Sequence, residues 1–184
     1  MPRNRLTRIT TRTGDRGESG LADGSRRAKT DPVFTALGDI DELNSVLGIA
    51  ISELVDDATK AHLRTVQSRL FDLGGTIATP GTPSRFDGDV AVLDDLVATE
   101  NAKLDPLRNF VLPGGTRAAA SLHHARAVCR RAERSCWALH AAERFADTSG
   151  IVYLNRLSDL LFVLARLANA AAGHAETLWQ PRSE

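Results

Sequence analysis

Apolar residues recur at intervals of three and four over five long segments of this chain, and this periodicity constrains the fold more than any other feature. Such spacing gathers apolar side chains on one face of a helix, so each segment must bury that face against the others. The predicted helices span about residues 31–54, 57–78, 89–104, 116–145 and 150–172. Because the connections between them are short, neighbouring helices should be antiparallel, and the predicted fold is an all-α, five-helix bundle.

Composition and length agree with a single helical domain. The chain has 184 residues with 26 Ala and 23 Leu, whereas Ile and Val together number 17, which favours helices over a large sheet. At about 150 residues per domain, residues 1–184 form one domain. Residues 1–30 are expected to be a glycine-rich loop, residues 31–173 the bundle, and residues 174–184 a frayed tail.

The charge balance limits the classes of partner. Lys plus Arg and Asp plus Glu each number 23, so bulk charge does not favour nucleic-acid or acidic-membrane binding. No apolar stretch approaches the roughly 20 residues of a membrane span, and no secretory signal is evident. The arginines of the first twelve residues faintly resemble a transit peptide, but Leu6 and Ile9 alone would form its apolar face. We therefore expect a cytoplasmic protein, in which Cys129 and Cys136 are reduced core thiols.

The N-terminal run from Thr11 to Gly20 combines glycines with hydroxyl and arginine side chains. Closely spaced glycines allow backbone N–H groups to converge on a phosphate, and the side chains add further donors. The glycine spacing matches neither the Walker A loop nor GxGxxG. A phosphate-binding loop and a plain flexible loop both remain open from these residues.

A stripe of charge lies within the fourth predicted helix. Helical spacing places Arg126, Arg130, Glu133 and Arg134 on one face. Like charges one turn apart repel, so the stripe indicates an anion site, a solvated face or an interface with a carboxylate of another subunit. An arginine-rich nucleic-acid module is disfavoured, because no aromatic residues are interleaved with the stripe.

Two other helices add polar residues. In the fifth helix, Asn155 and Asp159 form a polar stripe, and Asn155 alone would more often be an interior hydrogen-bonding residue than a ligand contact. In the first helix, Asp41 is a candidate partner for an arginine of another helix or subunit. Asp39 and Glu42 are expected to be ordinary surface acids. A di-iron bundle is disfavoured because the chain lacks any Glu-x-x-His motif, so no metal-ligand set is predicted.

Five motifs occur together in a characteristic order. They are TGDRG at 13–17, DELNS at 41–45, FVLPGG at 110–115, CRRAER at 129–134 and YLNRLSD at 153–159. In this order, over about residues 9–169, the chain resembles the PduO-type ATP:cob(I)alamin adenosyltransferases.

The resemblance implies a homotrimer with active sites at subunit interfaces. It implies that Co(I) of reduced cobalamin attacks the ribose 5′ carbon of ATP, giving adenosylcobalamin and inorganic triphosphate, with Mg²⁺ on the phosphates. It also suggests transient contact with a cobalamin reductase or a cobalamin-dependent enzyme. An alternative is a carrier that binds ATP and cobalamin and chiefly delivers adenosylcobalamin to such an enzyme.

The resemblance also assigns residues. Those expected to bind the nucleotide are Thr11, Arg12, Thr13, Gly14, Ser19, Gly20, Lys29, Arg130, Arg131, Glu133, Arg134 and Asn155. Those expected to support catalysis are Arg130, Phe110, Arg126 and Asp41, with Arg126 pairing to Asp41 of a neighbouring subunit. Phe110 matches the aromatic residue that helps displace the lower axial base of cobalamin, which makes the cobalt easier to reduce. Glu18 departs from the family pattern, because an acid beside polyphosphate is unfavourable unless it points away or meets a cation.

Overall fold

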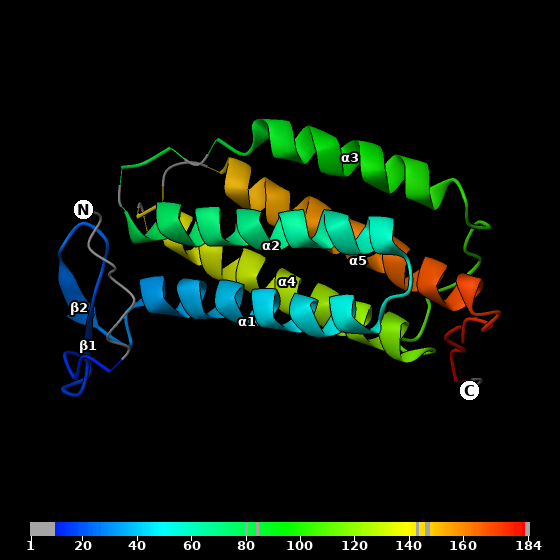
Figure 1. The fold of residues 1–184 in the computed structure, drawn as a ribbon, viewed down its shortest axis with the longest axis horizontal. Helices are drawn as coiled ribbons and strands as arrows, with labels where there is room; N and C mark the ends of the chain where they lie inside the picture. The colour runs from blue at the N-terminus through cyan, green and yellow to red at the C-terminus, as the bar shows by residue number, and fades with distance from the viewer. Residues whose placement is uncertain (1–9, 80, 84, 143, 146–147, 183–184) are drawn as a thin grey trace.

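A computed structural model describes residues 10–79, 81–83, 85–142, 144–145 and 148–182. Five helices, each antiparallel to the one before it in the chain, form an elongated bundle, which confirms the predicted all-α fold (Figure 1). The helices are α1 (Pro32–Glu53), α2 (Asp57–Ala78), α3 (Asp87–Asn101), α4 (Arg117–Ala141) and α5 (Ser149–Ala171). Helix α4 packs against α1 and α5, α5 also packs against α3, and α1 packs against α2.

The core is built from the apolar stripes of these helices. Leu43 and Leu47 of α1, Leu122 of α4, and Leu154 and Leu157 of α5 are fully buried. The predicted thiols Cys129 and Cys136 also lie in this core as free cysteines. Burial raises the pKa of Cys136 to about 12, which keeps the sulfur protonated and unreactive.

Capping residues set the helix starts. The Asp31 side chain accepts from the N–H of Val33, and Thr116 caps α4 in the same way through the N–H of Ala119. Helix α4 ends at Ala141, earlier than predicted, and Phe145 beyond it is buried in the core. Leaving the helix allows the chain to turn this ring inward.

The N-terminal segment is more ordered than the predicted loop. Strands β1 (Glu18–Gly20) and β2 (Arg26–Ala28) form an antiparallel hairpin, with Ser19 opposite Arg27. Leu21 packs against the core, and the N–H of Ala22 donates to the carbonyl of Ala78 at 3.0 Å. These contacts hold the hairpin at the end of the bundle where α1 begins (Figure 1).

The prediction of a frayed C-terminal tail is wrong for residues 177–179, and residues 183–184 lie outside the described residues. The N–H of Leu112 donates to the carbonyl of Thr177, and the N–H of Trp179 donates to the carbonyl of Phe110, both at 2.8 Å. Val111 and Leu178 form an antiparallel bridge between these bonds. The tail is therefore paired with the segment before α4, at the end of the bundle opposite the hairpin (Figure 1).

Within the described ranges, no helix combines the length and the apolar character that crossing a membrane requires. The transit-peptide interpretation of the N-terminal arginines falls mostly on residues 1–9, outside the described residues.

Candidate active site

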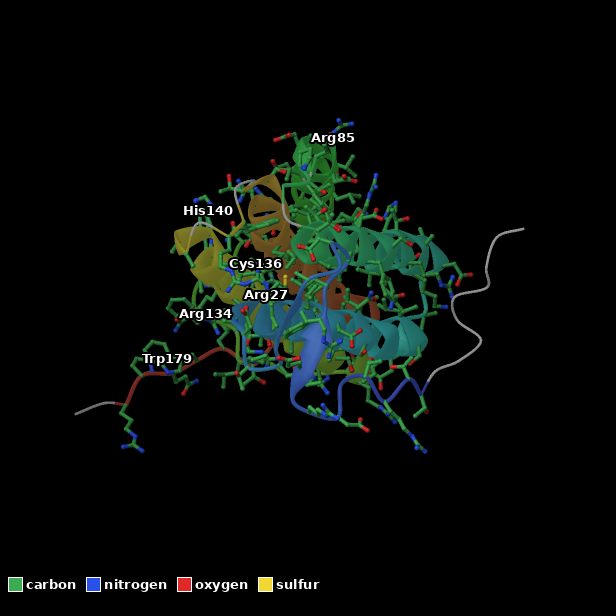
Figure 2. All side chains as sticks on the ribbon, turned by 90° about the vertical axis from the view of Figure 1, so that its left-hand side faces the viewer. Arg27, Arg85, Arg134, Cys136, His140 and Trp179 are labelled. Atoms are coloured by element: carbon green, nitrogen blue, oxygen red, sulfur yellow. The ribbon has the colours of Figure 1, made fainter. Side chains whose placement is uncertain are left out.

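Three arginines occupy successive turns of one face of α4. Arg126, Arg130 and Arg134 are spaced i, i+4 and i+8, and none forms an ion pair with another of the described residues. Arg130 and Arg134 are exposed, and Arg134 projects from the outer side of α4, whereas the sulfur of Cys136 lies inside the bundle (Figure 2). Unpaired cations one turn apart repel each other, so this face is suited to a polyanion.

Arg131 lies on a different face and already has partners. Its Nε donates to Asp39 Oδ1 at 3.0 Å, and its Nη2 contacts Glu42. The hydroxyl of Ser135 donates to the other oxygen of Asp39. The hydrogen bond to Asp39 is the main reason that the pKa of Arg131 is raised. The expectation that Asp39 and Glu42 are ordinary surface acids is wrong, because they join α1 to α4.

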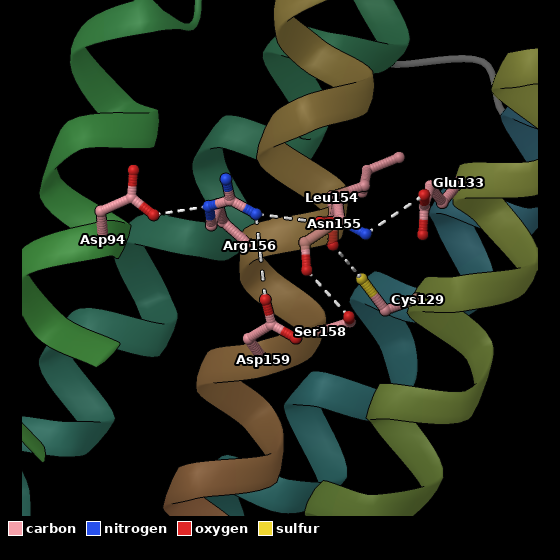
Figure 3. A network of polar contacts seen from close by, with 8 residues as sticks. All are labelled: Asp94, Cys129, Glu133, Leu154, Asn155, Arg156, Ser158 and Asp159. Atoms are coloured by element: carbon pink, nitrogen blue, oxygen red, sulfur yellow. Dashed lines mark hydrogen bonds and ion pairs between the residues drawn. The ribbon is translucent and has the colours of Figure 1, made fainter. Parts of the chain in front are cut away.

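Asn155 connects the α4 stripe to α5. Its Nδ2 donates to Glu133 Oε1 at 3.3 Å, and its Oδ1 accepts from Arg156 (Figure 3). Arg156 in turn pairs with Asp94 of α3, so a line of polar contacts runs from α4 through α5 to α3. This line fixes the carboxylate of Glu133 and the amide of Asn155 beside the free arginines.

The hairpin end supplies a compact loop with cationic side chains. The carbonyl of Gly14 accepts from the N–H of Gly17, and the carbonyl of Gly17 accepts from the N–H of Lys29. A Cβ at Gly14 would lie 3.0 Å from Lys29 Nζ. Because glycine has no side chain, the ammonium group of Lys29 can lie against the loop. Arg12 has a left-handed backbone, with φ of 60°, which is uncommon outside glycine. Thr11 and Thr13 hydroxyls lie 3.0 Å apart on the same loop.

Glu18 meets a cation, which is one of the two arrangements expected for an acid near this loop. Arg26 Nε lies 3.5 Å from Glu18 Oε2 across the hairpin, and Arg26 Nη2 donates to the carbonyl of Thr13 at 2.7 Å. Arg26 therefore neutralises the charge of Glu18 and also stabilises the loop through its hydrogen bond to Thr13. The hairpin partner was missed from the sequence because the loop was not expected to pair.

Arg126 and Asp41 are not joined within one chain. Asp41 is exposed on α1 and has no ion pair with any described residue. Arg126 lies over the ring of Phe162 at 6.0 Å, and its Nε is buried without a hydrogen-bond partner. Arg126 therefore has no ion-pair partner among the described residues, and a buried guanidinium nitrogen without an acceptor is costly.

Phe110 lies far from the hairpin. It precedes α4 at the opposite end of the bundle, and the helix rises about 20 Å between Arg117 and Arg130 (Figure 1). Its side chain is 77% exposed and meets Trp179 edge-on, with ring centroids 6.3 Å apart. A single chain therefore brings together Arg130, Glu133, Arg134 and Asn155, but it leaves Phe110 apart from the hairpin.

Around Phe110, local sequence patterns did not reveal four residues that contact its segment or the paired tail, namely Trp179, Glu176, Arg166 and Asn169. Among the described residues, no group of three or more His, Cys, Asp or Glu side chains is placed to hold a metal ion. The donors at this site are mainly cations and backbone groups, which suits an anionic ligand.

Comparison with known proteins gives the family. Residues 9–168 match the family described as "Cobalamin adenosyltransferase". The chain is 50% identical over 183 residues to a cobalamin adenosyltransferase of Cupriavidus metallidurans, covering 98% of each chain. It is 43% identical to a corrinoid adenosyltransferase of Mycobacterium leprae, covering 96% of this chain and 97% of the relative.

Solved structures of corrinoid adenosyltransferases have the same fold as this chain. A variant PduO-type ATP:corrinoid adenosyltransferase from Lactobacillus reuteri, complexed with cobalamin and ATP, superposes with a TM-score of 0.89 at 31% identity, covering 95% of this chain and all of that one. Another variant of that enzyme, complexed with ATP, superposes with a TM-score of 0.87 at 32% identity, covering 94% of this chain. Because the family match covers residues 9–168 and these relatives are 43% and 50% identical over nearly the whole chain, this chain belongs to the cobalamin adenosyltransferase family.

Proposed function

We propose that this protein transfers the 5′-deoxyadenosyl group of ATP to Co(I) of reduced cobalamin. The electron pair of Co(I) forms the cobalt–carbon bond, the bond between C5′ and its phosphate oxygen breaks, and inorganic triphosphate leaves with the electron pair of the broken bond. The structural observation that carries the proposal is the face of α4 on which Arg130 and Arg134 are exposed and form no ion pair with any described residue. The enzymes named among its relatives support the choice of ATP and a corrinoid.

In this reaction the protein positions the two substrates and neutralises the charge of the leaving triphosphate. Co(I) is a strong nucleophile, so no general base is needed, and the leaving triphosphate requires positive charge. Arg130 and Arg134 meet this need from α4, and Lys29 and Arg12 from the hairpin loop. Glu133 and Asn155, held by their mutual hydrogen bond, are suited to the ribose or adenine.

The remaining hairpin residues complete the proposed nucleotide site. The hydroxyls of Thr11, Thr13 and Ser19 and the backbone of Gly14 and Gly20 are suited to phosphate oxygens. Mg²⁺ bridging those oxygens would reduce the charge that the arginines must balance. Arg131 is held by Asp39 and Glu42, so its contribution is to fix the adjoining turn or to contact the nucleotide from that position.

We further propose a homotrimer with active sites at subunit interfaces. Arg126 and Asp41 each lack an ion-pair partner among the described residues, so they are suited to pair between subunits. The separation of Phe110 from the hairpin also favours a site shared by two chains. Two free buried thiols are typical of a reducing compartment, so we place the activity in the cytoplasm, where a cobalamin reductase or cobalamin-dependent enzyme would make transient contact.

An anaerobic assay tests the proposal. Protein, ATP, Mg²⁺ and chemically reduced cobalamin are mixed, loss of the Co(I) spectrum is followed, and triphosphate is measured. Adenosylcobalamin with one triphosphate per turnover is expected. Binding of ATP and cobalamin without turnover would instead support the carrier, and no binding would contradict both functions.

A further inference from the structure

The segment that carries Phe110, residues 105–116, is hydrogen-bonded at both ends to α5 and is called the Phe110 segment below. Arg166 Nη2 donates to the carbonyl of Asp105 at 2.9 Å, at the start of this segment. At its end, the amide of Asn169 accepts from the N–H of Thr116 at 2.9 Å and donates to the carbonyl of Gly114 at 3.2 Å. Arg166 and Asn169 are one turn apart, so a single face of α5 holds both ends.

Arg166 also holds the C-terminal tail. Its Nε lies 3.0 Å from Oε1 and 3.2 Å from Oε2 of Glu176, and the Arg166 side chain is only 6% exposed. Because the guanidinium is buried, loss of the Glu176 charge would leave it without its counter-ion. The pair therefore fixes the point from which the tail continues.

The tail in turn supports the middle of the Phe110 segment. The residue after Glu176 begins the backbone pairing, through Thr177 to Leu112 and through Trp179 to Phe110. Asn109 Nδ2 adds a bond of 2.7 Å to the carbonyl of Trp179. The Phe110 side chain is mostly exposed, so these bonds and the Trp179 ring, rather than core packing, determine its position.

We propose that the buried ion pair between Arg166 and Glu176 is a positioning device for Phe110. The ion pair holds the tail against α5, and the paired tail orients the Phe110 ring toward the corrinoid. This hold of the ion pair on the tail is called the clamp below. The inference rests on the proposed function for its catalytic consequence, but its structural part stands on the contacts alone. Arg166 and Glu176 are positioning residues, because they act through the tail.

The structural part is tested with Trp179 as a reporter. The chain has two tryptophans, so W137F leaves Trp179 as the single fluorophore. In that background E176Q should increase acrylamide quenching of Trp179 and speed proteolysis of the tail, while circular dichroism shows an intact bundle. Glu176 is chosen over Arg166 because Arg166 also binds Asp105. The matched control is E100Q, which removes a partly buried carboxylate of α3 that pairs with Lys103 just beyond the helix, and it should change neither readout.

The catalytic part is tested by a split in kinetics. E176Q should lower kcat with cobalamin on the order of 10- to 100-fold, as misplacement of a positioning group does, and leave KM for ATP within about twofold. With cobinamide, a corrinoid that lacks the lower base, the same variant should lose little activity. E176D, which keeps the charge, should recover part of the rate.

The possible outcomes distinguish the structural role of the ion pair from its catalytic role. Unchanged quenching and proteolysis in E176Q would overturn the clamp, whatever the activity of the enzyme. A released tail with normal cobalamin kinetics would overturn the positioning role. If wild-type protein forms no adenosylcobalamin, the proposed function fails, while the quenching result still decides whether the clamp exists.

Discussion

Asn169 of α5 and Gly115, two residues before α4, lie so close that no side chain fits between them. A Cβ built on Gly115 would overlap the Asn169 amide, with Cγ only 2.6 Å away, and the glycine has a φ of +99°. The same amide bonds Gly114 and Thr116 on either side. The junction between the Phe110 segment and α4 therefore depends on a glycine facing an asparagine.

Gly115→Ala should lower the free energy of unfolding by about 2–4 kcal/mol, because overpacking adds to the strain of a left-handed alanine. Urea denaturation measures the change. Gly173→Ala is the control, since Gly173 also has a positive φ, +65°, but has open space around it. It should lose about 1 kcal/mol. Equal losses in the two variants would show that contact with Asn169 is unimportant.

Arg130→Ala should reduce kcat/KM for adenosyl transfer on the order of 10²- to 10³-fold, because a charge-assisted contact to the leaving triphosphate would be lost. The control is Arg64→Ala, which removes another exposed arginine, on α2, without an ion pair among the described residues. Anaerobic kinetics on both variants check the prediction. Wild-type efficiency in the Arg130 variant would remove this residue from the reaction.

Asp41→Asn should weaken both the oligomer and its activity, because it removes the carboxylate proposed for Arg126 of a neighbouring subunit. A double-mutant cycle with Arg126→Gln should give a coupling of about 2 kcal/mol in subunit association. Analytical ultracentrifugation measures it. Asp95→Asn, an exposed acid on α3, is the control and should leave assembly unchanged. Additive effects of the two substitutions would mean that these side chains do not pair.

His123 should make stability depend on pH. It is 3% exposed, both ring nitrogens lack hydrogen-bond partners, and burial followed by Arg126 lowers its pKa below 6.5, although Glu176 opposes this. Near pH 6 the unfolded state then binds more protons than the folded state, so the free energy of unfolding rises with pH up to about the unfolded pKa of 6.5.

His123→Leu should flatten that dependence, because the leucine cannot bind a proton. Urea denaturation at several values between pH 5 and 8 measures the slope. The exposed neighbour offers the control His124→Gln, which should keep the wild-type slope. An unchanged slope in His123→Leu would assign the pH dependence to other groups.

The comparison of α4 with the hairpin and the tail shows where sequence reasoning succeeds. The α4 stripe was predicted because Arg126, Arg130 and Arg134 are spaced by helical turns, and this spacing needs no knowledge of distant residues. The hairpin was missed because Arg26 pairs with Glu18 only after the chain reverses. Arg131 looked equivalent to Arg130 in sequence, but contact with Asp39 of α1 distinguishes them.

By itself, the sequence determined the five helices, the buried stripe of α5 and the motifs that place the chain in its family. These features depend on local periodicity and on side-chain chemistry. The tertiary structure alone decided which arginines remain free, that Arg166 holds Glu176, and that the tail pairs with the Phe110 segment. Backbone pairing is nearly independent of side-chain identity, and its partners here come from distant parts of the chain, so no local pattern could reveal it.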